Sequence, residues 1–117
     1  AKAPEAIGPY SQAIVHGGLL FTSGQIAINP ASGQVEADTI EGQTEQVMKN
    51  LAALLEEAGA SFDSVIKTTC FLSDMADFAA FNAIYGAYFV SKPARSCVAA
   101  KQLPKNVLVE VELIAAV

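Results

Sequence analysis

The sequence predicts a single α+β domain over residues 1–117, in which one mixed β-sheet carries two helices on one face. Three observations support this fold class. Segments of the strand type, rich in β-branched and aromatic residues, make up both ends of the chain. Two amphipathic segments with the helical period lie between them, separated by one further strand. The order β-β-α-β-α-β-β is most simply satisfied by one sheet with both helices on the same side.

The chain begins with two predicted strands, residues 10–16 and 19–28. They are joined by Gly17-Gly18, a strong signal for a two-residue hairpin turn. Gly24 lies in the middle of the second strand and indicates a bulge or a close approach by other atoms. A turn-forming stretch follows, and residues 34–35 then add a short third strand.

The first helix is predicted over residues 38–58. Asp38 and Glu41 have the spacing of a capping box at its start, and Gly59 takes the position just after its end. One stripe of the helix is apolar and is expected to face the sheet. Its members are Val47, Met48, Leu51, Leu54, Leu55 and Ala58.

A buried strand and a second helix come next. Residues 65–72 are β-branched and aromatic, as expected for a strand. The helix begins after Ser73 or Asp74, either of which can cap it, and runs to about Val90. Pro93 ends it. Its apolar face consists of Phe78, Phe81, Tyr85, Tyr88 and Phe89.

The closing stretch, residues 93–112, reads as two strands joined by a short loop. The loop contains Pro104, which is barred from a central ladder position, and this favours an antiparallel hairpin. The two strands would then be neighbours in an otherwise apolar region. They would bring together a guanidinium, a thiol and two carboxylates. Burying these charges costs free energy unless they pair with each other or bind a ligand. These groups belong to Arg95, Cys97, Glu110 and Glu112.

The composition favours an oligomer and excludes several classes of function. The chain is 52% hydrophobic and 16% charged, which is apolar for a monomer of 117 residues, so a second copy is expected to cover the open face of the sheet. No apolar run is long enough to cross a bilayer. The net charge of −5, with scattered lysines, disfavours nucleic acid as the main partner.

The two cysteines and the single histidine predict neither a metal site nor a cofactor. Cys70 and Cys97 fall within predicted strands, and the absence of a secretory signal favours two reduced thiols in the cytoplasm, with one disulfide as the alternative. His16 is the only histidine and no C-x-x-C pair occurs, so the spacing of a metal site is missing.

Arg95 has the strongest case for a functional role, and Glu110 and Glu112 are paired on one strand face, where one could orient the arginine and the other handle water. The planar fork of Arg95 suits bidentate binding of a carboxylate, and the alternative is an internal salt bridge to Glu110 or Glu112. A carboxyl group in an apolar pocket has a raised pKa, which suits acid–base work near neutrality. The alternative for both glutamates is a solvated face of an edge strand. Cys97 has no histidine within its motif to activate it, so a small packing residue is its expected role.

Four spaced motifs resemble the Rid family, the reactive intermediate deaminases also called YjgF or L-PSP. They are IGPYSQA at residues 7–13, FTSGQI at 21–26, VIKTTCFLSDMADFAAFNAIYGAYF at 65–89 and PARSCVAAKQLPKNVLVEVELIA at 93–115. The resemblance covers essentially the whole chain. It implies a chorismate-mutase-like α+β fold and a homotrimer with three ligand clefts at the subunit interfaces.

The resemblance also implies an activity: hydrolysis of 2-iminopropanoate and 2-iminobutanoate to 2-oxo acids and ammonia, without metal or cofactor. Arg95 would bind the substrate carboxylate and Glu110 would activate the attacking water. The remaining residues expected to line the cleft, some from a neighbouring chain, are Tyr10, Ser23, Gly24, Asn82 and Cys97.

One segment departs from the family pattern. Only residues 90–92 separate the second helix from Pro93, where many relatives carry a longer segment, and this affects the expected substrate size and cleft closure. Three other functions stay open on the sequence. They are binding of small carboxylates without turnover, the ribonuclease or translation-inhibitor activity attributed to some relatives, and a protein-interaction or chaperone role that would depend on exposed apolar patches.

Overall fold

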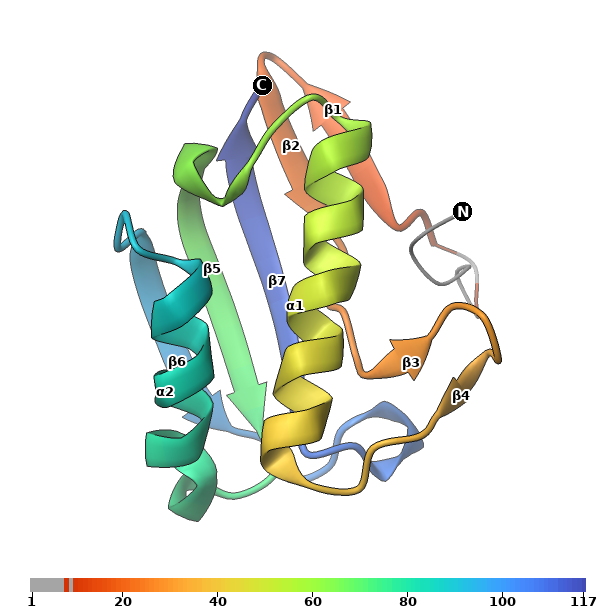
Figure 1. Ribbon diagram of the computed structural model, residues 1–117. Helices are drawn as coiled ribbons and strands as arrows, with labels where there is room; N and C mark the ends of the chain where they lie inside the picture. The colour runs from red at the N-terminus through yellow and green to blue at the C-terminus, as the bar shows by residue number, and fades with distance from the viewer. Residues whose placement is uncertain (1–7, 9) are drawn as a thin grey trace.

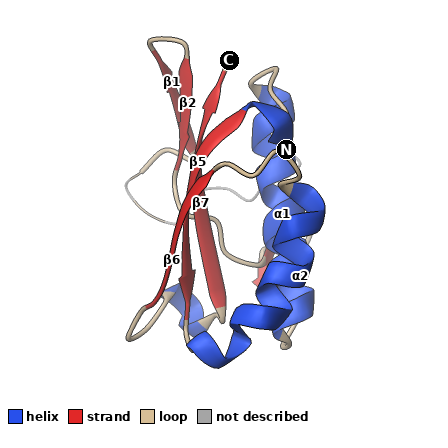
Figure 2. Cartoon of the chain, turned by 90° about the vertical axis from the view of Figure 1, so that its left-hand side faces the viewer, coloured by secondary structure: helices blue, strands red, loops and turns tan. Residues whose placement is uncertain are grey.

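The computed structural model describes residue 8 and residues 10–117, which fold into two layers (Figures 1 and 2). One layer is a five-stranded mixed sheet of order β1-β2-β7-β5-β6. Both α-helices pack on the same face of this sheet (Figure 2). The predicted fold class is therefore confirmed. The strands of the sheet are β1 (Ala13–His16), β2 (Leu19–Thr22), β5 (Val65–Leu72), β6 (Ala94–Ala99) and β7 (Val109–Ala116), and the helices are α1 (Ile40–Glu57) and α2 (Phe78–Tyr88).

The first hairpin forms as predicted but with shorter strands. Gly17 and Gly18 have φ angles of 60° and 76°, the left-handed region that a two-residue hairpin turn of the primed type requires. β2 ends at Thr22, and Gln25 then makes an isolated bridge to Val111 of β7. The residues beyond form a separate two-stranded sheet of β3 (Ile28–Asn29) and β4 (Gln34–Val35).

Helix α1 lies across the sheet and supplies much of the core. The side chain of Thr39 caps it, because Oγ1 accepts a hydrogen bond from the backbone N–H of Gly42 at 3.1 Å. The predicted cap at Asp38 is thus wrong by one residue, whereas Gly59 follows the helix with a φ of +75° as expected. The predicted stripe is buried at Val47, Met48, Leu51, Leu54 and Leu55.

A buried amide in α1 fixes the chain between β2 and β3. Nδ2 of Asn50 donates to the carbonyl of Ile26 at 3.1 Å and to that of Ile28 at 3.0 Å. Its Oδ1 accepts from Gln46 at 3.0 Å. Asn50 is fully buried, so these bonds satisfy groups that water cannot reach.

The predicted hairpin between the last two strands is wrong. β6 pairs with β5 in parallel, and β7 pairs with β5 from the other side and antiparallel. Helix α2 connects β5 to β6, and a strand–helix–strand unit places its two strands side by side and parallel. The chain then crosses from the edge of the sheet through the 3₁₀ turn η3 (Pro104–Asn106) to the central position of β7.

The face of the sheet opposite the helices carries exposed apolar side chains. Ile14 and Phe21, which are partners in β1 and β2, are 54% and 38% exposed. Val98 of β6 is 50% exposed. Exposed apolar side chains on one sheet face are typical of a surface that a second chain covers. None of the described helices has the length and apolar character needed to span a bilayer.

Candidate active site

Arg95 lies on the helix-covered face of the sheet, at the edge strand β6. It is the register partner of Thr68, which is buried beneath α2. Its Nη1 donates to Oδ1 of Asn82 in α2 at 2.7 Å. The guanidinium also lies 4.8 Å from the ring centroid of Tyr85 and 5.4 Å from that of Phe78. An amide and two aromatic rings from one helix therefore hold the arginine in place.

The guanidinium has no carboxylate partner among residue 8 and residues 10–117. Glu110 and Glu112 project from the opposite face of the sheet, because their register partners Phe71 and Thr69 alternate with the buried side chains of β5. The alternative of an internal salt bridge is thus wrong for the described residues. With one N–H bound to Asn82, the fork keeps donors for an anionic ligand.

A cavity of about 490 Å³ opens beside Arg95. Among the described residues, the charged side chains that line it are two cations, Arg95 and Lys92. It is lined by Asn82, Tyr85, Gly86, Phe89, Val90, Lys92, Pro93 and Arg95.

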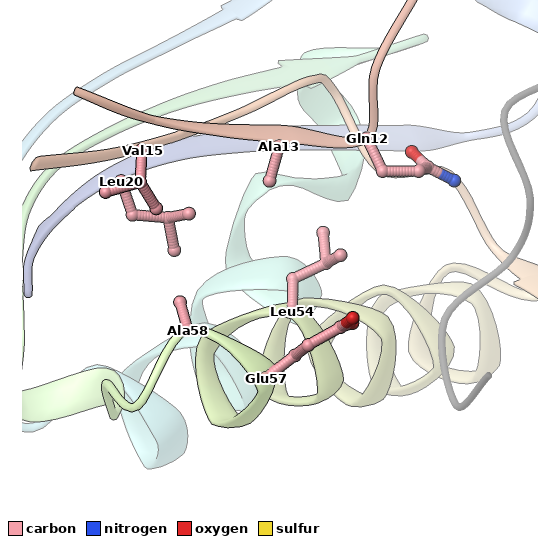
Figure 3. Close-up of a pocket in the computed structure, with 7 residues that line it drawn as sticks. All are labelled: Gln12, Ala13, Val15, Leu20, Leu54, Glu57 and Ala58. Atoms are coloured by element: carbon pink, nitrogen blue, oxygen red, sulfur yellow. The ribbon is translucent and has the colours of Figure 1, made fainter.

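A second cavity, of about 320 Å³, lies between the β1–β2 hairpin and the last turns of α1 (Figure 3). In the part of the chain that the structure describes, the charged side chain that lines it is Glu57, a carboxylate, which would repel an anion. The cavity at Arg95 is therefore the better candidate for a carboxylate substrate.

Tyr85 is a site residue that sequence reasoning assigned to the core alone. Its ring stacks beneath Arg95, and its hydroxyl shares a 2.7 Å hydrogen bond with Oγ1 of Thr68. Burial raises the pKa of Tyr85 above its ordinary value, so the phenol stays neutral. The spacing was the available signal, since Phe78, Asn82 and Tyr85 recur at helical intervals on one face.

Cys97 lies on the same face as Arg95, two residues further along β6. Its register partner is Cys70 in β5, and both thiols are free. Burial raises the pKa of Cys97 and outweighs the opposing effect of the nearby Arg95 charge. A protonated thiol is a poor nucleophile, which agrees with a packing role.

Glu110 lies on the open face, where Gly24 makes room for it. A Cβ built on Gly24 would overlap Oε2 of Glu110 and lie 2.7 Å from Cδ. Loss of hydration on burial raises the pKa of Glu110, and the charge of Glu112 raises it further. β7 is central in the sheet, so the predicted alternative of a solvated edge strand is wrong. A half-buried carboxyl group with a raised pKa is suited to proton transfer.

Ser23 and Tyr10 lie in the chain around β1. The backbone of Ser23 precedes Gly24, and its hydroxyl donates to the carbonyl of Ser11 at 2.6 Å. Tyr10 is 45% exposed in the segment before β1. Tyr10 therefore belongs to the segment that leads into β1, the edge strand opposite β6, and Ser23 is hydrogen-bonded to that segment.

Six of the predicted site residues thus form two groups on opposite sides of one sheet, and Tyr10 belongs to neither. The Arg95 half-site consists of Arg95, Asn82 and Cys97, and the Glu110 half-site consists of Ser23, Gly24 and Glu110. Strand β5 separates the strands that carry Arg95 and Glu110, contrary to the prediction that these strands are neighbours. In the described part of the chain, no cluster of three or more His, Cys, Asp or Glu side chains could hold a metal ion.

Fold and site together define an α+β protein with a cavity at the Arg95 guanidinium and a separate, half-buried carboxyl group at Glu110. The profile of the family described as Endoribonuclease L-PSP matches residues 1–117, and the chain belongs to this family, which is also called Rid or YjgF.

Similar proteins agree with this assignment. The chain is 58% identical to AldR of Lactococcus lactis over 116 residues, covering 98% of this chain and 92% of AldR. It is 46% identical over 118 residues to 2-iminobutanoate/2-iminopropanoate deaminase of Escherichia coli, covering 97% and 91% of the two chains. The crystal structure of E. coli TdcF with bound serine superposes with a TM-score of 0.93 at 41% identity, covering 99% and 94%.

Proposed function

We propose that this protein hydrolyses 2-imino acids such as 2-iminopropanoate and 2-iminobutanoate to 2-oxo acids and ammonia, as one domain in the cytoplasm. The observation that carries the proposal is Arg95, a guanidinium held by Asn82 and two aromatic rings beside a cavity and not neutralised by a carboxylate. The name of the E. coli relative and the serine bound to TdcF support a substrate of amino-acid shape.

The substrate carboxylate binds the free N–H groups of Arg95, which leaves the adjacent C=N carbon open to water. Glu110 in its carboxylate form takes a proton from the attacking water as the O–C bond forms. The C=N electron pair moves to nitrogen, and protonation there gives a carbinolamine. The carbinolamine hydroxyl then gives its proton, through Glu110, to the amine nitrogen. The C–N bond breaks, its electron pair leaves with ammonia, and the C=O bond of the 2-oxo acid forms, so both protons of the attacking water end on ammonia.

The raised pKa of Glu110 fits both parts of this sequence. A carboxylate with a pKa above its ordinary range is a stronger base toward water than a solvated glutamate. Its conjugate acid can still return the proton to nitrogen, so one carboxyl group serves in both directions. Neither a metal nor a cofactor is needed in this reaction.

We further propose that the active site is completed between chains of a homotrimer. Arg95 and Glu110 lie on opposite faces of one sheet, so one chain alone does not present them to one substrate. A neighbouring copy whose Glu110 half-site meets the Arg95 half-site would do so. The exposed apolar side chains of the open face, Ile14, Phe21 and Val98, support such a contact.

The experiment follows decay of 2-iminobutanoate generated in situ by a threonine dehydratase. Wild type accelerates the decay; Arg95→Ala raises KM and lowers kcat, and Glu110→Gln lowers kcat. Lys105→Gln, at an exposed position that does not line the Arg95 cavity, is the control. Folded wild-type protein that leaves the decay rate unchanged would refute the hydrolase. Tight binding of 2-oxo acids in the same preparation would then indicate a binding protein.

A further inference from the structure

The cavity at Arg95 holds a second cation that the proposed reaction does not use. Lys92 lines the same cavity, and the lining residues from position 8 and positions 10–117 include no acidic side chain. The chain as a whole carries a net charge of −5, so two cations at one cavity form a local positive region on an acidic protein.

The backbone places Lys92 at this cavity. Its N–H donates to the carbonyl of Phe89 at 3.1 Å, which closes the turn between α2 and β6. Its φ is 56°, in the left-handed region that favours glycine or asparagine, yet a long cationic side chain occupies it. Lys92 lies three positions before Arg95, so the two Cα atoms are at most about 11 Å apart.

The cavity is larger than a short imino acid requires. 2-Iminobutanoate has about seven heavy atoms, and even at about 30 Å³ each, the liquid volume of one water, it fills less than half of the 490 Å³. Phe89, Val90 and Lys92 line the same cavity as Arg95. A longer ligand bound through Arg95 can therefore reach the second cation.

We infer that Lys92 is a specificity-determining residue for substrates with a second acidic group, so that the site takes 2-imino dicarboxylic acids such as 2-iminoglutarate. The α-carboxylate binds Arg95, and the distal carboxylate faces the Lys92 ammonium. This inference deepens the proposed function, because the choice of an imino acid as substrate rests on that function. The recognition of two carboxylates by Arg95 and Lys92 does not rest on it, because the stable 2-oxo diacids carry the same two carboxylates.

Binding therefore tests the inference separately from turnover. Isothermal titration compares 2-oxoglutarate with 2-oxopentanoate, a ligand of equal length without the distal charge. We expect wild type to bind the diacid more tightly, and Lys92→Gln to weaken diacid binding about fivefold, the upper end for an exposed ion pair. Monoacid binding should change by less than twofold, and added salt should reduce the difference between the ligands.

Lys105→Gln is the matched control, because Lys105 is also exposed and has the same φ of 56° but does not line the cavity. Lys92→Arg should keep the preference for the diacid. Equal affinity of wild type for both ligands, or an equal loss for both in Lys92→Gln, would overturn the inference, as would failure to bind either ligand. Turnover of 2-iminopentanoate and 2-iminoglutarate, measured in parallel, reports on the hydrolase independently.

Discussion

Gly24 offers the sharpest test of how the carboxyl group of Glu110 is positioned. In Gly24→Ala, the new Cβ would overlap Oε2 of Glu110 and lie 2.7 Å from Cδ and 2.9 Å from Cγ. All three atoms belong to one flexible side chain, so the clash is relieved when that side chain rotates away. The cost in stability is therefore small, about 1 kcal/mol at the low end for overpacking.

The cost in activity is much larger. Moving the carboxyl group by about 1 Å removes it from the attacking water, and a misplacement of that size costs about 100-fold in rate. This corresponds to about 2.7 kcal/mol in activation free energy. We expect kcat for 2-iminobutanoate to fall about 100-fold in Gly24→Ala, with KM nearly unchanged.

Gly33→Ala is the matched control. A Cβ there meets nothing within 4 Å, but the φ of +70° is unfavourable for alanine. Stability should fall by about 1–2 kcal/mol and Tm by several degrees, while activity stays at the wild-type level. Full activity in Gly24→Ala, or an activity loss that tracks Tm in both variants, would refute the reasoning.

Three further predictions concern pH, the buried amide and the thiol. The raised pKa of Glu110 predicts that kcat/KM rises with pH through a midpoint above the ordinary glutamate value, and that Glu112→Gln moves this midpoint down; an unmoved midpoint would contradict the assignment. The folded state holds this proton more tightly than the unfolded state, so stability falls as pH rises through that range. Glu110→Gln should therefore raise the free energy of unfolding at pH 7 but not below about pH 4. Asn50→Ala leaves two carbonyls unsatisfied and should cost about 2–4 kcal/mol in urea unfolding, against less than about 0.5 kcal/mol for Gln102→Ala, whose bond is exposed. The raised pKa of Cys97 predicts slower reaction with a disulfide reagent at pH 7 than a free thiol shows, and retention of most activity in Cys97→Ser; fast labelling would point to a nucleophile.

Local patterns in the sequence predicted the elements well but not their neighbours. The hairpin at Gly17-Gly18 and the apolar stripe of α1 follow from turn chemistry and helical period, and both formed. Pro104 predicted a loop, and a loop is present. Whether the strands on its two sides pair with each other depends on which strand already occupies the adjacent edge, and no local pattern records this.

The candidate site shows the same limit. Alternation within each strand was predicted correctly, so Arg95 and Cys97 share one face, and Glu110 and Glu112 share another. The position of the Arg95 pair relative to the Glu110 pair was not predicted correctly, because it depends on the order of the strands in the sheet. Tyr85 was assigned to the core because an aromatic residue on an apolar helix face usually lies there, and its contact with Arg95 appears only when α2 packs over β6.

The account's central claim is that Arg95 of one chain and Glu110 of another act on one substrate. The most direct measurement unfolds and refolds an equal mixture of Arg95→Ala and Glu110→Gln, each with strongly reduced activity alone, and assays 2-iminobutanoate hydrolysis. In a cyclic trimer with random assembly, about a quarter of the interfaces pair an intact Arg95 with an intact Glu110, so about a quarter of wild-type activity should return. Recovered trimers without activity would show that both groups act from the same chain and would contradict the account.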